Sequence, residues 1–122
     1  MTRALVTGAT GMLGSHLVER LLGSGVKVRA FIRPSSDARF LQALPVEIMR
    51  GNATDPSDLA CAVQGCDLVF HLAADFNVGS GLSENRDARR IRSSIVDITE
   101  GLLAASWAAG IRRFVYISST SV

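Results

Sequence analysis

The stretch of sequence that decides the fold is Thr7-Gly8-Ala9-Thr10-Gly11-Met12-Leu13-Gly14. It follows a short apolar run at 4–6 and precedes a segment in which Leu13, Leu17 and Leu21 recur every four residues. This order of apolar run, glycine-rich turn and amphipathic segment predicts a strand, a turn and a helix. Glycines in such a turn let backbone N–H groups approach a pyrophosphate, and a helix start favours an anion. Taken alone, the turn is weak evidence for nucleotide binding, and a purely structural turn is the alternative.

Apolar runs and helical segments alternate along the rest of the chain. The runs that predict strands buried on both faces lie at 4–6, 26–32, 46–49, 67–72 and 114–118. The spacing predicts helices over 13–22, 39–44, 55–64 and 91–110, the third of them starting at the cap signal Asp55-Pro56. Such alternation predicts an α/β fold with a doubly wound parallel sheet in strand order 3-2-1-4-5.

A polar, glycine-containing stretch at 76–90 is the only long segment without a strand or helix pattern. It follows the fourth predicted strand, so it belongs to the carboxyl edge of the sheet, where folds of this kind bind ligands. Arg86, Arg89, Arg90 and Arg92 form a basic cluster there. A solvated helix start and a site for an anionic substrate or partner are the two interpretations of that cluster.

Composition narrows the class of protein. The chain has 122 residues, of which 48% are hydrophobic and 20% charged, so we expect one globular domain over 1–122 and exclude disorder, collagen and a coiled coil. A net charge of +2 gives no argument for nucleic acid. No apolar run approaches the ~20 residues that a membrane helix needs. Cys61 and Cys66 make neither a disulfide framework nor a metal site, which suits the cytoplasm.

The spacing TGxxGxxG resembles the short-chain dehydrogenase/reductase superfamily, and in particular its extended branch. Four further segments agree in order, namely those at 28–37, 51–55 (GNATD), 71–74 (HLAA) and 113–119 (RFVYISS). The resemblance covers the whole chain and is closest to the dihydroflavonol-4-reductase-like and NAD-dependent epimerase/dehydratase-like group. It implies a Rossmann fold that is shortened relative to the family.

The resemblance implies a nicotinamide dinucleotide as cofactor. Arg33 falls about 20 residues beyond the glycines, where an acidic residue would accept from the ribose of NAD. A guanidinium offers a fork to a 2′-phosphate instead, so NADP is favoured, with NAD as the alternative. Ser35 and Ser36 could add hydroxyl contacts, and a solvated surface arginine is the competing interpretation. The full set of expected cofactor-binding residues is Gly8, Thr10, Gly11, Met12, Leu13, Arg33, Ser35, Asn52, Ala53, Leu72, Ala73 and Ala74.

Two polar residues near strand ends have competing interpretations. Asn52 stands where the family usually has an Asp that meets the adenine amino group. Asn keeps one carbonyl acceptor and loses the charge, and a residue that only forms a turn is the alternative. We expect His71 to be a packed core histidine rather than a catalyst.

The resemblance places one catalytic residue, Ser119, which would hold and polarise a substrate carbonyl; Thr120 and Ser121 are close alternates. The superfamily's proton donor, a Tyr four residues before a Lys, has no match here. Thr120 stands four residues after Tyr116, and Lys27 lies far upstream. We therefore expect cofactor binding without turnover.

In a complete protein of this type, the resemblance implies hydride transfer at a carbonyl or alcohol carbon, catalysed by an oxidoreductase or epimerase. A non-catalytic nucleotide sensor and an isolated or engineered scaffold are the alternatives.

The fifth predicted strand suggests how the chain assembles. It contains neither Pro nor Lys, the residues that commonly block pairing at an open sheet edge. We expect a homodimer that pairs through this strand or through the last helix around Trp107. Trp107 and Phe114 are interpreted as core or interface residues.

Overall fold

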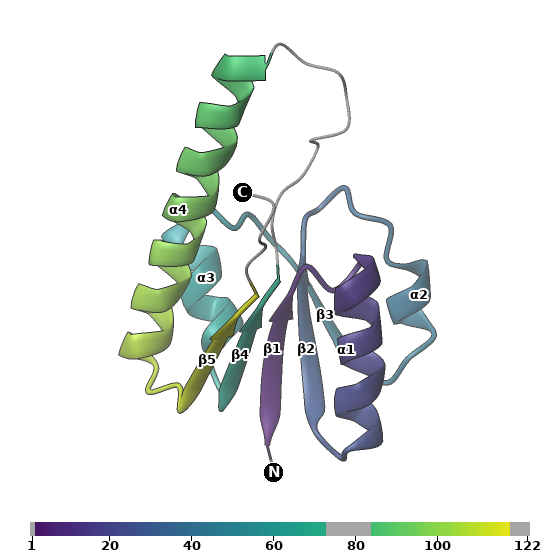
Figure 1. The fold of residues 1–122 in the computed structure, drawn as a ribbon. Coiled ribbons are helices and arrows are strands. Elements are labelled where there is room, and N and C mark those ends of the chain that lie inside the picture. Colours follow the sequence, from purple (N-terminus) through teal and green to yellow (C-terminus); the bar gives the residue numbers. More distant parts are fainter. Residues whose placement is uncertain (1, 73–83, 118–122) are drawn as a thin grey trace.

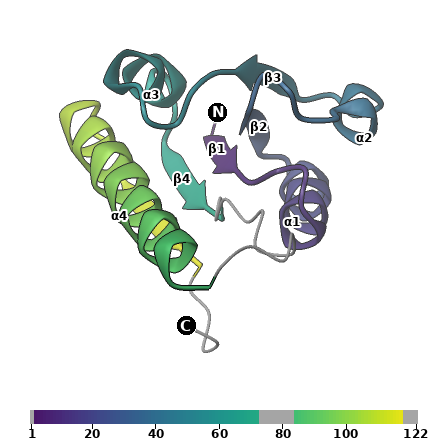
Figure 2. The same ribbon diagram turned by 90° about the horizontal axis from the view of Figure 1, so that it is seen from above.

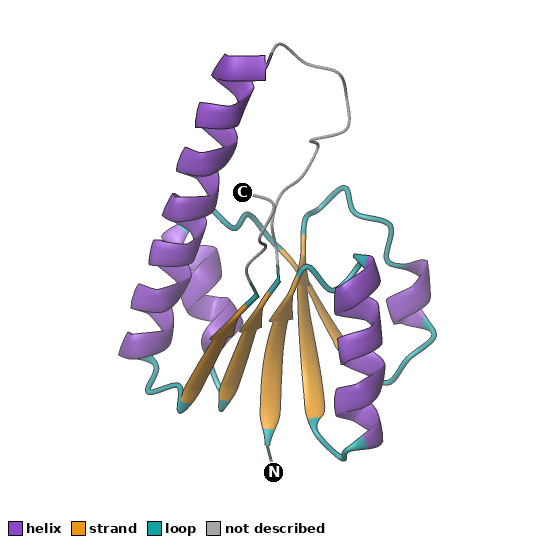
Figure 3. Cartoon of the chain, viewed as in Figure 1, coloured by secondary structure: helices purple, strands orange, loops and turns teal. Residues whose placement is uncertain are grey.

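The computed structural model describes residues 2–72 and 84–117, and of residues 84–95 it describes the backbone only. Strands and helices alternate along the chain, as Figures 1 and 3 show. The strands are β1 (Arg3–Thr7), β2 (Lys27–Ile32), β3 (Glu47–Arg50), β4 (Leu68–His71) and β5 (Arg113–Tyr116). The helices are α1 (Met12–Gly23), α2 (Arg39–Gln42), α3 (Pro56–Val63) and α4 (Glu84–Ala108).

The strands form one parallel sheet in the order β3-β2-β1-β4-β5, which confirms the predicted doubly wound topology. β1 is central, and its last residue Thr7 lies beside Phe31 of β2 and His71 of β4. After β3 the chain crosses back to place β4 on the other side of β1. The strand order therefore reverses between β1 and β4, and ligands of such sheets bind outside the carboxyl ends at that point.

The first two helices cover one face of the sheet, and the last two cover the other. α1 and α2 lie on one face, and α3 and α4 on the other (Figures 1 and 2). Successive residues of β1 serve opposite faces, because side chains alternate along a strand. Leu5 is buried with Leu59 and Leu102 on the α3 and α4 side, whereas Val6 is buried with Val18 on the α1 side.

The predicted helix signals correspond to observed contacts at α3. The Asp55 side chain accepts a hydrogen bond from the Ser57 backbone N–H at 2.9 Å, and Pro56 opens the first turn. Gly65 follows the helix with φ +76°, a conformation that favours glycine. The Asp55-Pro56 start is thus confirmed.

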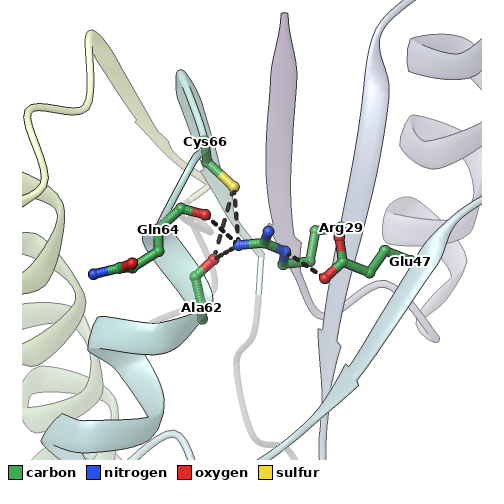
Figure 4. Close-up of polar contacts among 5 residues, drawn as sticks. All are labelled: Arg29, Glu47, Ala62, Gln64 and Cys66. Carbon is green, nitrogen blue, oxygen red and sulfur yellow. Dashed lines mark hydrogen bonds and ion pairs between the residues drawn. The ribbon is translucent and has the colours of Figure 1, made fainter.

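A buried arginine joins three elements in the half of the sheet away from the carboxyl ends. Arg29 of β2 is 8% exposed. Its guanidinium donates from Nε to Glu47 at 3.0 Å, and from Nη1 to the carbonyls of Ala62 at 2.7 Å and Gln64 at 2.6 Å (Figure 4). These carbonyls belong to the C-terminal end of α3, where a cation is favoured. The Cys66 Sγ lies 3.6 Å from the same Nη1, and burial raises the pKa of this thiol.

One expectation about α4 is wrong, and the structure excludes one of the two interpretations of Trp107. The helix begins at Glu84, not at residue 91, so the second half of the 76–90 stretch is helical. That part has no apolar residue but Ala88, so periodicity could not reveal it. Trp107 is 90% exposed and is not a core residue. The buried stripe of α4 runs through Ile98, Leu102 and Ser106, and the next position along the helix points about 100° away from it.

Smaller differences concern element ends. α2 stops at Gln42 rather than 44, and β5 spans Arg113–Tyr116 rather than 114–118. β5 is the outer strand of the sheet, and Phe114 packs against the core while Val115 and Tyr116 are partly exposed. Among the described residues, no helix combines the length and the apolar character needed to cross a membrane.

Candidate functional site

A cleft of about 670 Å³ lies at the carboxyl ends of the strands. Its walls come from the turn after β1, the loop after β2, the loop after β3 and one face each of α3 and α4. The lining residues include Gly8, Thr10, Gly11, Met12, Leu13, Arg33, Ser35, Ser36, Asn52, Ala53, Thr54, Leu59, Leu72, Ile98, Leu102 and Ile117.

Two glycines of the turn after β1 are required by the fold itself. Gly8 has φ +71°, in the left-handed region that favours glycine. An added Cβ on Gly14 would lie 2.0 Å from the Gly8 carbonyl oxygen, which no backbone shift of ordinary size could relieve. Helix α1 therefore packs directly on the turn that precedes it.

Gly11 differs from these two glycines. Its φ of −76° and ψ of 171° suit any residue, and an added Cβ would meet only the Gly8 oxygen, at an ordinary 3.4 Å. Gly11 is the N-cap residue of α1, and neither a capping side chain nor an acidic residue in the first turn serves this helix start. Among the described residues, no side chain caps the N-terminal N–H groups of α1 beside the cleft, an arrangement suited to an anion.

The loop after β2 presents cations and hydroxyls to the cleft. Arg33 and Ser35 lie on its wall. Behind them, the Arg50 Nη1 donates to the carbonyl oxygens of Pro34 at 2.9 Å and Ser36 at 3.0 Å. Arg50 ends β3 and pairs in register with Ile32, so the sheet itself brings its guanidinium to this loop. Arg50 therefore both fixes the loop and adds a second positive charge near Arg33.

The acidic residue of this loop is already paired. The Asp37 carboxylate accepts from Arg39 Nη2 at 2.7 Å and from its Nε at 3.1 Å. The hydrogen bond from Arg39 lowers the pKa of Asp37 to about 2, and the charge of Arg50 acts in the same direction. The loop thus keeps its positive character beside the cleft.

The loop after β3 forms a tight, internally bonded turn. The Asn52 Oδ1 accepts from the Thr54 N–H at 2.9 Å and from the Thr54 hydroxyl at 2.6 Å. The Asn52 N–H donates to the Asp58 carboxylate at 2.8 Å, which anchors the turn to α3. Asn52 therefore forms the predicted turn and also lines the cleft. A Cβ on Gly51 would lie 2.9 Å from the Phe31 ring, so the approach of this turn to β2 is close.

His71 is the buried polar group behind the cleft. It is fully buried, with Nδ1 at 2.7 Å from the Thr7 hydroxyl and Nε2 at 3.0 Å from the Thr99 hydroxyl. Its ring stacks on Tyr116 with centroids 5.4 Å apart. Burial lowers the pKa of His71 from 6.5 to about 4, so the ring is neutral at pH 7. The expectation of a packed core histidine is confirmed, and its hydrogen bonds tie α4 to the end of β1.

Most of the predicted cofactor-binding residues lie together on this cleft: Gly8, Thr10, Gly11, Met12, Leu13, Arg33, Ser35, Asn52, Ala53 and Leu72. Ala73, Ala74 and Ser119 lie outside the described residues, as do the side chains of Arg86, Arg89, Arg90 and Arg92. In the described part of the chain, no group of three or more His, Cys, Asp or Glu residues could hold a metal ion.

The sequence analysis missed two features at the cleft. Leu59, Ile98 and Leu102 lie at its apolar base, but their spacing looks like ordinary helix core. Arg50, which bonds to the loop after β2, was not identified. The strand order could have indicated it, because in a parallel sheet the last residue of β3 lies beside the end of β2.

The sequence model of the NAD dependent epimerase/dehydratase family matches residues 4–122 of this chain. A curated relative, the 3 beta-hydroxysteroid dehydrogenase/Delta 5-->4-isomerase of Mycobacterium tuberculosis (strain CDC 1551 / Oshkosh), is 45% identical over 123 residues, which cover 98% of this chain and 32% of that protein. A putative dihydroflavonol 4-reductase of Synechocystis sp. is 40% identical, covering 95% of this chain and 32% of that protein.

Among solved structures, a short-chain dehydrogenase/reductase superfamily protein from Agrobacterium tumefaciens with bound NAD superimposes with a TM-score of 0.76 at 36% identity. The match covers 98% of this chain and 33% of that one. The present chain thus spans about a third of the length of the relatives it matches.

Proposed function

The chain belongs to the NAD dependent epimerase/dehydratase family, and from that premise we propose that its cleft binds a nicotinamide dinucleotide, with NADP preferred to NAD. The observation that carries the proposal is Gly11. Nothing in its backbone conformation or its described surroundings requires a glycine, yet it sits at an uncapped helix start on the wall of the cleft. A missing side chain there leaves room for a ligand's pyrophosphate to reach the backbone.

The residues of the cleft fit the other parts of the cofactor. The N-terminal N–H groups of α1 would hold the pyrophosphate, because they and the helix dipole favour an anion. The half-buried apolar side chains of Ala53 and Leu72 on the cleft wall would face the flat surface of a base. When bound, the nicotinamide ring supplies or accepts the hydride in a reaction at a carbonyl or alcohol carbon.

The proposed preference for NADP rests on two arginines near the loop that follows β2. Arg33 lies on the cleft wall, and Arg50 holds the same loop through carbonyls 2.9 and 3.0 Å away. Two guanidinium groups beside one loop favour a ligand with an additional phosphate, since charge-assisted contacts to phosphate are about twice as strong as neutral ones.

The complete reaction requires more than these residues. The described part of the chain holds no Tyr followed four residues later by a Lys, and Ser119, the proposed holder of the substrate carbonyl, lies outside it. We propose that this chain supplies the cofactor-binding part of an oxidoreductase or epimerase. We further propose that it works in the cytoplasm, where its free Cys61 and Cys66 stay reduced, and that it pairs as a homodimer through β5 or the exposed Trp107 face of α4.

Calorimetric titration with NADP and NAD tests the proposal. A charge-assisted hydrogen bond is worth roughly 1.5–3 kcal/mol, so Arg33→Ala should weaken NADP by about 10- to 150-fold and leave NAD nearly unchanged. Arg112→Ala, an exposed arginine before β5, is the matched control and should change neither affinity. Equal losses for both nucleotides in Arg33→Ala would overturn the choice of NADP, and no binding of either by the unaltered chain would overturn the function.

A second assay addresses turnover. Incubation of the chain with NADPH and a panel of ketones and aldehydes should give no enzyme-dependent loss of absorbance at 340 nm. General acid–base assistance is worth about 100- to 10,000-fold, and no residue of the described chain occupies the proton donor's place. Substantial turnover would reveal a proton donor other than the superfamily's tyrosine.

A further inference from the structure

The hydrogen bonds of the turn after β3 fix which way the Asn52 amide faces. The Thr54 backbone N–H can only donate, so the atom 2.9 Å away must be the amide oxygen and not the nitrogen. The Thr54 hydroxyl lies 2.6 Å from the same oxygen and donates to it. A carbonyl oxygen has two lone pairs, and both are therefore used inside the turn.

The group that Asn52 still offers is its Nδ2 amide, with two N–H donors. This nitrogen makes no hydrogen bond with the residues that the structure describes, and Asn52 is exposed on the wall of the cleft. The main chain of the residue cannot swing away easily, because its N–H is bonded to Asp58 at 2.8 Å. Asn52 thus presents a fixed donor where an aspartate would present a second oxygen acceptor.

Purine bases differ in the substituent on C6, with which a side-chain amide at the edge of the base can form a hydrogen bond. Adenine carries an amino group on C6, which donates, whereas hypoxanthine and guanine carry an oxygen there, which accepts. A donor on the protein cannot pair with the amino group, but it can pair with the oxygen, or with the neighbouring N1 of adenine. The aliphatic side chains of the cleft, among them Leu59, Ile98 and Leu102, form no hydrogen bonds and do not distinguish the two kinds of base.

We propose that the Nδ2 donor of Asn52 lets the cleft accept dinucleotides of 6-oxopurines as well as those of adenine, whereas an aspartate at this position would select adenine. The inference rests on the proposed nucleotide-binding function and extends it to the base. Specificity of this kind is a difference of two affinities, so it is measured as a ratio.

The test compares each adenine dinucleotide with its hypoxanthine counterpart: NADP with nicotinamide hypoxanthine dinucleotide phosphate, and NAD with nicotinamide hypoxanthine dinucleotide. Within each pair, the dissociation constants of the unaltered chain should differ by less than about threefold, since both bases offer an acceptor to a neutral donor. Asn52→Asp keeps an oxygen for Thr54 and adds a free acceptor. It should favour adenine by about tenfold or more, because hydrogen bonds to charged groups are the stronger ones.

The controls separate base reading from general effects. The new charge of Asn52→Asp repels the phosphates of both members of a pair equally, so it cancels in the ratio. Thr54→Val retains the backbone N–H but removes the hydroxyl, which frees one lone pair of the Asn52 oxygen. The ratio should then move toward adenine by a smaller factor than in Asn52→Asp.

The outcomes are distinct. An unaltered chain that binds the adenine dinucleotides and rejects the hypoxanthine forms by more than about tenfold overturns the base inference and leaves the nucleotide-binding function intact. A ratio that Asn52→Asp does not move also overturns it. A chain that binds none of the four dinucleotides overturns the proposed function together with the inference.

Discussion

Two arginine-containing regions lie at opposite ends of the same sheet and differ in how their polar groups are satisfied. At Arg29 the guanidinium is buried and bonded to Glu47 and to two carbonyls at the end of α3 (Figure 4). At the cleft Arg33 is exposed, and α1 begins without a capping side chain. The first region is bonded within the protein, whereas in the second, among the described residues, no side chain caps the N–H groups at the start of α1.

The difference separates structural from functional use of the same residue type. Buried polar groups are paired because an unpaired one costs about 1–3 kcal/mol. Exposed N–H groups at a helix start carry no such penalty in water, so they remain available to a ligand. Substitutions in the first region should therefore change stability, and substitutions at the cleft should change nucleotide affinity.

The largest expected effect is on stability, from Arg29→Met. The substitution leaves the carbonyls of Ala62 and Gln64 without their donor and removes the partner of Glu47. The Glu47 side chain is 53% exposed, so the main cost comes from the two carbonyls. A buried acceptor left without its donor costs about 1–3 kcal/mol, which urea denaturation should record as a lower free energy of unfolding. Arg112→Met, at an exposed position, should change that free energy by less than about 0.5 kcal/mol. If Arg29→Met is as stable as the unaltered chain, the division between the two regions fails.

A pH dependence should arise from His71, the buried polar group next to the cleft. Its pKa is about 4 in the folded chain against 6.5 ordinarily, so the unfolded chain binds the proton first as the pH falls. Stability is therefore full above about pH 7 and declines between 6.5 and 4. The decline amounts to about 3 kcal/mol in total, of which about 2 kcal/mol is lost by pH 5.

Urea denaturation at pH 7 and pH 5 measures this loss, and variants assign it to a residue. His71→Gln should show a smaller loss between the two pH values, because Gln does not titrate. His16→Gln is the matched control, since that ring is exposed on α1, and it should keep the full loss. Equal pH dependence in both variants would remove His71 as the cause.

Gly11→Ala should weaken the binding of the dinucleotide without lowering the stability of the fold. The new methyl group meets only the Gly8 oxygen, at 3.4 Å, so the free energy of unfolding should change by less than about 0.5 kcal/mol. The same methyl group occupies the surface where the pyrophosphate would approach the backbone, and we expect the dissociation constant to rise by about tenfold or more. Gly23→Ala, where a Cβ meets nothing within 4 Å at the other end of α1, is the control. Unchanged affinity in Gly11→Ala would argue against a pyrophosphate at this turn.

The smallest expected effect comes from Arg50→Met. It removes solvent-exposed hydrogen bonds to the carbonyls of Pro34 and Ser36, which water can replace, and one positive charge near Arg33. NADP should bind about three- to tenfold more weakly, whereas stability should hardly change because Arg50 is exposed. The control is Arg20→Met, an exposed arginine in the last turn of α1. A loss of stability as large as that of Arg29→Met would place Arg50 with the structural arginines.

Local patterns were enough to predict the sheet order and the glycine turn, because strand alternation and the spacing of the turn at 7–14 are properties of adjacent residues. The same holds for most polar residues of the cleft, which lie in the turns directly after predicted strands. The start of α4 escaped because residues 84–90 carry almost no apolar residue. Helices of that kind leave no periodic signal.

Contacts between distant segments could not be predicted. Arg29 contacts carbonyls 33 and 35 residues away, and Arg50 reaches carbonyls 14 and 16 residues away. Both depend on strand register and on where α3 ends. The exposure of Trp107 likewise depends on which side of α4 faces α3, and a rotation of one residue decides it.

The three glycines of the first turn are under different structural constraints. The fold requires glycine at Gly8 because its φ is +71°, and at Gly14 because an added Cβ would lie 2.0 Å from the Gly8 carbonyl oxygen. Nothing among the described residues imposes a glycine at Gly11. If the cleft binds the proposed nucleotide, a lineage that kept this architecture and abandoned the nucleotide would be free to vary at Gly11 while Gly8 and Gly14 stayed fixed. Under that proposal, the middle glycine would mark which relatives still use the cofactor and which have kept only the scaffold.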